Sequence, residues 1–347
     1  MMRARRCSLT SLLLATGTSQ LARSSNWFLV FVLAMVACGG TLDAGYDEPR
    51  GLLPVDSRNP VVVCNDGPID NWQGEYVALL ASTGGISLAG IVISDSAPWP
   101  NLADNLAGWQ QMVTAARDSG LRNIPDPMQS KGPVFVRPSD GSIDSTKSNR
   151  SEGASFILDV SKQRSQPFRP LVVVTGGRLT DLADAYLMDH SVPERVVVVS
   201  ALGTTTTSGG AMGSPNGDLD TWADYIVAQK YRYVQVSAYY DQATDFPANV
   251  LQQLPVNAFT SWIKAKQPNV WKSTIATDQV GILALAIPAF VASVNRASES
   301  GFGSDNSTPV LSSEQSGSVW LVTQITNAFA SAQLWKMLLD PATFQTK

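Results

Sequence analysis

This sequence of 347 residues lacks several features that mark common classes of protein. It has one histidine and three cysteines, and their spacing is not that of a zinc site. It contains no Walker loop, no Gly-x-Ser-x-Gly elbow and no basic stripe, and its formal net charge is −4. The single histidine, His190, follows a predicted helix and is poorly placed for a catalytic triad. These absences argue against a zinc protein, a serine-type α/β hydrolase and a nucleic-acid-binding surface.

The N-terminal segment 1–38 predicts an export signal. Arginines precede an uninterrupted apolar run at 27–37, which is short for a spanning helix and suits the core of a signal peptide. The run ends in Met-Val-Ala-Cys-Gly-Gly, which resembles a bacterial lipobox with Cys38 as the lipidated residue. We expect a protein of the bacterial cell envelope or a secreted one, whose only membrane attachment is a lipid on Cys38. Plain signal cleavage near this residue is the alternative.

The rest of the chain divides into a predicted linker at 39–59 and one large domain at 60–347. The linker contains Gly, Asp and Pro residues, as a tether does. Beyond Cys38 the chain has only Cys64, so we expect no disulfide framework. The domain is long enough to bury a large core.

Short apolar runs alternate with longer amphipathic segments after residue 60, a pattern typical of an α/β fold with a mostly parallel central sheet flanked by helices. The predicted strands are Pro60–Cys64, Leu88–Ser94, Pro170–Thr175, Arg195–Ser200 and Tyr233–Ser237. The predicted helices are Gln73–Ser82, Asn101–Asp118, Glu152–Lys162, Leu179–Met188, Leu219–Gln229, Ala258–Gln267, Ile282–Ala292 and Ser318–Leu339. The polar, turn-rich stretch Arg137–Arg150 is expected to be an excursion from this alternation.

The loop after the first predicted strand concentrates oxygen ligands. It holds two carboxylates and two amides within seven positions, at Asn65, Asp66, Asp70 and Asn71. Ligands bind at the carboxyl ends of strands in open α/β sheets, and oxygen atoms on one turn suit a hard cation such as calcium. The structural alternative is an Asx-rich helix cap.

Three further motifs follow in order. A predicted strand ends in Thr175-Gly176-Gly177-Arg178-Leu179-Thr180-Asp181, which also fits a simple strand–turn–helix connection. Asn216-Gly217-Asp218-Leu219-Asp220 precedes a predicted helix, and Ile275-Ala276-Thr277-Asp278-Gln279 precedes an apolar one.

On these four motifs the chain resembles the inosine-uridine preferring nucleoside hydrolase family. That family carries D-x-D-P-G-x-D-D, T-G-G-L-T-N, N-x-x-x-D and H-D-P at the corresponding places. The resemblance covers roughly residues 60–340. It implies a nucleoside hydrolase-like fold, a small-molecule nucleoside or riboside as the partner, and hydrolysis of an N-glycosidic bond. It also allows an oligomer.

The resemblance implies a role for each matching position. The calcium ligands would be Asp66, Asn71, the backbone carbonyl of Thr175, and Asp278. Asp66 would also be the base that activates water, whereas Asp70 and Asn216 would bind the ribose.

Several departures from the family pattern leave two hypotheses open. Asn71 replaces a carboxylate, so calcium should bind weakly, within the range of about 0.1–1 mM that extracellular modules use. Thr277 replaces the histidine that protonates the leaving base in some members, and Ser214 replaces a glutamate. The first hypothesis is a divergent calcium-dependent hydrolase, and the second is a non-catalytic nucleoside- or sugar-binding surface lipoprotein. Two tryptophans near strand ends, Trp72 and Trp99, could line the pocket in either case.

Overall fold

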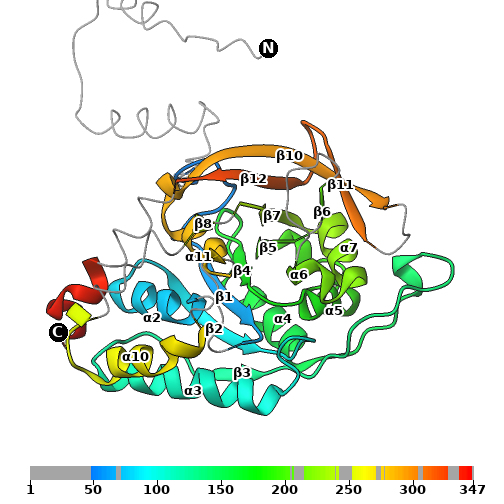
Figure 1. Cartoon of the computed structure of the whole chain (residues 1–347). Helices are drawn as coiled ribbons and strands as arrows, with labels where there is room; N and C mark the ends of the chain where they lie inside the picture. The colour runs from blue at the N-terminus through cyan, green and yellow to red at the C-terminus, as the bar shows by residue number, and fades with distance from the viewer. Residues whose placement is uncertain are drawn as a thin grey trace, which may run out of the picture. The chain divides into compact units, whose positions relative to one another are not determined.

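The folded unit comprises residues 48–347 and contains one large sheet (Figure 1). The computed structural model describes residues 48–67, 72–203, 205–206, 215–238, 240–241, 252–270, 275–276, 278–303, 308–326 and 336–345. Within these residues the strands of the sheet are β1 (Pro60–Asn65), β2 (Ser87–Ile93), β3 (Pro127–Gln129), β4 (Leu171–Thr175), β5 (Val196–Ala201), β6 (Thr205–Thr206), β7 (Arg232–Val236), β10 (Val291–Phe302), β11 (Pro309–Ser313) and β12 (Val319–Ile325). A separate pair joins β8 (Tyr240–Asp241) to β9 (Ile275–Ala276).

The sheet is mostly parallel, as the sequence predicts. Its order is β3-β2-β1-β4-β5-β7-β12-β10-β11-β6. Every pairing from β3 to β12 is parallel, and only β10 runs antiparallel to its two neighbours. The carboxyl ends of the parallel strands therefore meet at one edge of the sheet.

Successive side chains of the central strands enter two different hydrophobic cores. In β1, Val61 and Val63 belong to one core, whereas Val62 and Cys64 belong to the other. This division follows from the two-residue repeat of a strand and explains why the central strands are apolar throughout. Burial raises the pKa of the Cys64 thiol, which packs as a small hydrophobic residue.

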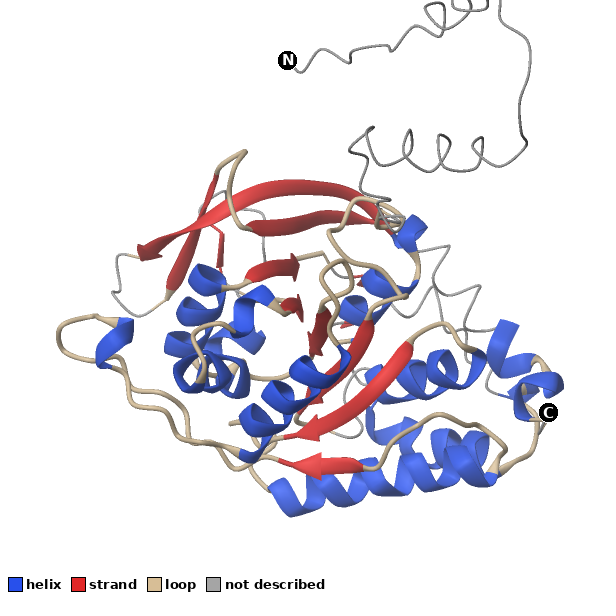
Figure 2. Cartoon of the chain, turned by 180° about the vertical axis from the view of Figure 1, so that it is seen from behind, coloured by secondary structure: helices blue, strands red, loops and turns tan. Residues whose placement is uncertain are grey.

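Helices cover both faces of the sheet (Figure 2). One core is shared with α2 (Gln73–Thr83), α3 (Leu102–Asp118), α10 (Ala258–Val270) and α11 (Gln279–Ala286). The other is shared with α4 (Glu152–Arg164), α5 (Thr180–Met188) and α7 (Thr221–Lys230). Three of these helices begin at a side-chain cap, because Asn101, Ser151 and Asp220 each accept a hydrogen bond from a backbone N–H in the first turn. Except for α11, the corresponding sequence predictions are confirmed to within about three residues.

Two predicted helices near the C-terminus are wrong. The expected helix at Ile282–Ala292 begins earlier and ends at Ala286, because Pro288 cannot donate the backbone hydrogen bond that would continue it. Val291 then starts the 12-residue strand β10. The expected helix at Ser318–Leu339 contains the strand β12, which pairs with β7 and with β10. The β-branched and aromatic residues of β12 suit a strand, and β12 is paired with a neighbouring strand on each side.

The second half of the predicted linker packs against the domain. Leu53 and Val55 are buried in the core, and Asn59 donates from Nδ2 to the carbonyl of Pro170 at 2.8 Å. Burial opposes ionisation of Asp56, but hydrogen bonds from Arg58 and from backbone N–H groups lower its pKa to about 2. The folded part of the chain therefore begins before Pro60.

The predicted excursion at 137–150 is confirmed, since it contains no strand and only a short 3-10 turn at Ile143–Ser145. Its end is fixed by the buried carboxylate of Asp184, which accepts hydrogen bonds from Ser148 Oγ and from the backbone N–H groups of Asn149 and Ser151, at 2.7–2.8 Å. Across the described ranges, no helix has the length and apolar character needed to cross a membrane.

Candidate functional site

Four residues singled out by sequence motifs meet at the carboxyl edge of the sheet. Asp66 follows β1, Thr175 ends β4, Asn216 lies in the short helix α6 (Pro215–Asp218), and Asp278 precedes α11. All four are buried. Asp70, Asn71 and Thr277 lie outside the described residues.

The Thr-Gly-Gly turn after β4 lies close to both Asp66 and Asp278. A methyl group built on Gly176 would lie 2.7 Å from Asn65 Nδ2 and 2.8 Å from Asp278 Cγ. One built on Gly177 would lie 3.3 Å from Asp66 Cγ. The two carboxylates thus approach the same pair of glycines, and only a residue without a side chain fits at Gly176.

Asp278 is surrounded by amide donors. Asn216 Nδ2 donates to its Oδ1 at 3.2 Å and also to the carbonyl of Ala201 at 2.7 Å. Asn65 Nδ2 lies 3.5 Å from Asp278 Oδ2 and 2.5 Å from Gln73 Oε1, and Gln73 Nε2 donates to the backbone carbonyl of Asp278 at 3.3 Å. Asn65, Gln73 and Asp278 therefore form a closed ring of hydrogen bonds. Because both donors of Asn216 are directed inward, its Oδ1 is the atom available to a ligand hydroxyl.

Some buried polar atoms beside this ring have no partner among the described residues. They are Asn65 Oδ1 and both polar atoms of Gln279, a side chain with no exposed surface. A buried polar group without a hydrogen bond costs about 1–3 kcal/mol of stability. The ring therefore has unused capacity to bind water, a cation or a ligand group.

Asp66 is a buried carboxyl group with few polar contacts. Burial raises its pKa, although hydrogen bonds from Ser96 and from the backbone N–H of Gly67, which lies 2.8 Å from Oδ1, and the charge of Arg178 act in the opposite direction. A carboxylate in this environment is suited either to taking up a proton or to binding a cation.

Arg178 is a residue of this site whose importance the sequence did not reveal. It is one residue more than the T-G-G-L-T-N pattern of the family that the chain resembles, and it is buried. Its Nη2 lies 2.6 Å from both Asp95 Oδ1 and the carbonyl of Gly132. Burial raises the pKa values of Asp66, Asp181 and Asp220, and the charge of Arg178 offsets part of this increase. The insertion therefore adds a buried cation that links the loop after β2 to the segment after β3.

The two tryptophans predicted to line a pocket differ in position. Trp99 lies against the loop after β1, because a methyl group on Gly67 would come within 2.7 Å of its indole. Trp72, in contrast, is buried in the core at the start of α2. His190 is exposed at the end of α5 and stacks on Tyr186 at a centroid distance of 4.7 Å, as expected for a surface residue.

No group of three or more histidine, cysteine, aspartate or glutamate side chains with metal-binding geometry occurs in the described part of the chain. Metal ligands among these residues would therefore have to include amide or backbone oxygens beside Asp66 and Asp278. Such mixed oxygen sets are typical of calcium rather than of zinc.

The sequence of this chain matches no protein-family model and no curated protein. Its structure is similar to those of solved nucleoside hydrolases. An inosine-uridine preferring nucleoside hydrolase from Bacillus anthracis has a TM-score of 0.58 at 12% identity, over 81% of this chain and 99% of that one. A purine-preferring ribonucleoside hydrolase from Gardnerella vaginalis has a TM-score of 0.55 at 13% identity, over 82% and 100%.

A further similar structure is a nucleoside hydrolase-related protein from Saccharophagus degradans described as associated with carbohydrate metabolism. It has a TM-score of 0.52 at 14% identity, over 84% of this chain and 73% of that one. At these identities the likeness concerns the architecture, and the central sheet with flanking helices agrees with it. The chain therefore has a nucleoside hydrolase-like fold.

Proposed function

We propose that this protein hydrolyses the N-glycosidic bond of a ribonucleoside or a related riboside and that it requires calcium. The observation that carries the proposal is the meeting of Asp66, Thr175, Asn216 and Asp278 at the carboxyl edge of a nucleoside hydrolase-like sheet. These residues come from four distant parts of the sequence, and each was selected by its motif.

The residues present are compatible with a bound calcium ion. The carboxylates of Asp66 and Asp278 both approach the Gly176–Gly177 turn, and Asn65 Oδ1 is a buried acceptor without a partner among the described residues. The ligands would be these two carboxylates, the carbonyl of Thr175, and Asn71 from the adjoining loop. Calcium would supply a positive charge that binds sugar hydroxyls and makes a bound water more acidic.

The chain's own groups provide the remaining roles. Asp66 accepts the proton of the attacking water, and its raised pKa makes it a stronger base than an exposed carboxylate. Asn216 Oδ1 accepts a hydrogen bond from a ribose hydroxyl while its Nδ2 remains bound to Asp278 and Ala201. Asp70 binds the ribose as well.

A non-catalytic nucleoside- or sugar-binding protein is the second candidate. It is favoured by the two amide side chains that donate to Asp278, since these interactions satisfy the carboxylate without a metal. Asn71 and Thr277, which replace a carboxylate and a histidine of the family pattern, favour it as well.

The experiment that separates the two candidates is hydrolysis of 4-nitrophenyl β-D-riboside by the protein without residues 1–38. Nitrophenol release in millimolar calcium that stops in excess EDTA supports the hydrolase. Asp66→Asn should lower the rate by about 10²–10⁴-fold, whereas Asp189→Asn, in the surface segment after α5, should leave it unchanged. Nucleoside binding that persists in EDTA, without any release, would instead identify a binding protein.

We also propose that residues 1–38 direct export and that Cys38 carries the lipid anchor. The support is the apolar run followed by the lipobox-like sequence. Cell fractionation of wild-type protein and Cys38→Ser tests this proposal. The substitution should move the protein from the membrane fraction to the soluble exported fraction.

A further inference from the structure

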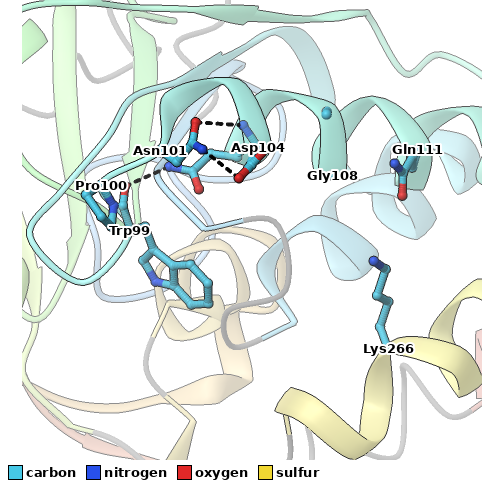
Figure 3. Close-up of a pocket in the computed structure, with 9 residues that line it drawn as sticks. Trp99, Pro100, Asn101, Asp104, Gly108, Gln111 and Lys266 are labelled. Atoms are coloured by element: carbon cyan, nitrogen blue, oxygen red, sulfur yellow. Dashed lines mark hydrogen bonds between the residues drawn. The ribbon is translucent and has the colours of Figure 1, made fainter.

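A pocket of about 360 Å³ is lined by residues of α3, of the segment before it and of α10 (Figure 3). Trp99 connects this pocket to the candidate site, because its indole touches Gly67 in the loop after β1 and also lines the pocket. Asn105 fixes this arrangement, since its Nδ2 donates to the carbonyls of Ser94 at 3.2 Å and Trp99 at 2.9 Å. A group attached to a sugar at the Asp66 site could therefore extend into the pocket.

The pocket combines an aromatic surface with a lysine that has no charged partner among the described residues. Lys266 extends from α10 toward α3 and lines the pocket together with Trp99 and Gln111 (Figure 3). It makes no ion pair or hydrogen bond with any residue that the structure describes. Among the described residues of the lining, the one carboxylate is that of Asp104. Asn101 Nδ2 donates to this carboxylate at 2.6 Å, and the backbone N–H of Asp104 donates to Asn101 Oδ1 at 3.3 Å. The ammonium group of Lys266 is therefore available to a ligand.

The chain has no histidine that could protonate a leaving group here. Its single histidine, His190, lies on the surface beside Tyr186. A leaving group that departs as an anion needs a positive charge rather than a proton, and a fixed cation near the developing charge stabilises it. An aromatic ring would in addition stack on Trp99.

We infer that this pocket binds an aromatic aglycone that departs as an anion and that Lys266 selects for the negative charge of the departed aglycone. The inference rests on the proposed function. In the reaction, a bond forms between the water oxygen and the anomeric carbon, and the bond from that carbon to the aglycone breaks. The electron pair leaves with the aglycone as an anion paired with Lys266, and the proton of the water passes to Asp66.

Binding of benzoate and benzamide tests the inference without requiring turnover, because the two probes have nearly the same shape and differ in charge. Titration calorimetry of the protein in calcium should show benzoate binding about tenfold more tightly than benzamide. Lys266→Met should abolish the preference, and Lys266→Arg should retain it. The matched control is Lys264→Met, because Lys264 lies on the same helix and donates to the carbonyl of Leu254 at 3.4 Å. Trp99→Leu should weaken the binding of benzoate and of benzamide by the same factor.

Equal affinities for the two probes, or a preference that survives Lys266→Met, would overturn the inference even if the protein hydrolyses ribosides. Conversely, a Lys266-dependent preference in a protein that cleaves no riboside would support the charged pocket while refuting the proposed hydrolase. If the protein cleaves the riboside and also shows the Lys266-dependent preference, Lys266→Met should lower kcat/KM for 4-nitrophenyl β-D-riboside about tenfold. Lys264→Met should leave kcat/KM unchanged.

Discussion

Arg178 Nη2 lies 2.6 Å from Asp95 Oδ1, so the residue inserted into the Thr-Gly-Gly turn is bonded to the loop that follows β2. The arginine side chain is only 6% exposed, whereas the aspartate side chain is 40% exposed. The same nitrogen donates to the carbonyl of Gly132. One buried cation thereby connects three segments around Asp66, and its loss should lower both stability and activity.

We predict that Arg178→Met lowers the free energy of unfolding by about 1–3 kcal/mol, because it leaves the carbonyl of the buried Gly132 without its donor. Urea unfolding followed by circular dichroism measures this. Lys162→Met serves as the control, since among the described residues Lys162 pairs only with Asp189, at 3.9 Å on the surface, and exposed pairs contribute about 0.2–1 kcal/mol. An Arg178 variant as stable as the control would show that the buried pair makes no special contribution.

Gly176→Ala should damage the candidate site directly. The added methyl group would lie within 2.8 Å of atoms of Asn65 and Asp278, so one of these side chains must move. We expect a loss of about 1–3 kcal/mol in stability, together with a lower rate of riboside hydrolysis. Gly177→Ala is the matched comparison, because its methyl group would lie 3.3 Å from Asp66 and should cost less. Equal effects of the two substitutions would contradict the packing described for the turn.

Asn216→Asp tests whether the site around Asp278 accepts a cation. The substitution would place a second carboxylate against Asp278, across the present 3.2 Å hydrogen bond. We expect a lower Tm in EDTA and a larger increase in Tm on addition of calcium than for the wild type, since a ligand that binds only the folded state stabilises it. Asn123→Asp adds the same charge at an exposed turn, so calcium should raise its Tm only as much as it raises that of the wild type. If calcium leaves the Tm of Asn216→Asp unchanged, the result would argue against a cation at this position.

The stability of the protein should depend on the protonation of Glu75. Burial at the start of α2 raises the pKa of this carboxyl group from 4.5 to about 7 in the folded protein. As the pH rises, the folded protein keeps the proton of Glu75 to a higher pH than the unfolded chain does. The contribution of the protonated Glu75 to the free energy of unfolding is therefore complete below about pH 4.5 and is lost as the pH rises through about 7. The difference of about 2.5 pKa units corresponds to about 3 kcal/mol.

Glu75→Gln should remove this pH dependence. Urea unfolding at pH 4.5, 6 and 8 should show a variant that is more stable than the wild type at pH 8 and similar to it at pH 4.5. Glu152→Gln is the control of opposite sign, because a hydrogen bond from the backbone N–H of Lys131 lowers the pKa of Glu152. Parallel stability curves for wild type and Glu75→Gln would mean that Glu75 ionises normally.

The central fold could be predicted because its signals are local. The strands Leu171–Thr175 and Val196–Ala201 are buried along their whole length and contain almost only β-branched or small residues. The strands β10 to β12 escaped prediction because their burial alternates irregularly with exposure and depends on pairing with β7. Such tertiary pairing leaves no periodic pattern in the sequence.

The candidate site could be predicted only in part, for a related reason. Asp66 and Asp278 were found through their motifs, and the structure places both at the Gly176–Gly177 turn. The contacts of Arg178 depend on backbone carbonyls and loops far along the chain. Asn65 and Gln73 are neutral amides, whose importance appears only when their ring with Asp278 is seen.

The antiparallel ribbon formed by β10, β11 and β12 also protects the molecule from self-association. Without it, the backbone donors and acceptors along one side of β7 would be open, because β12 is their partner there. An open strand of this kind recruits strands from other copies. A chain shortened to end before Val291 would therefore be expected to aggregate, even though the parallel strands from β1 to β7 and the residues at the Gly176–Gly177 turn would all still be present.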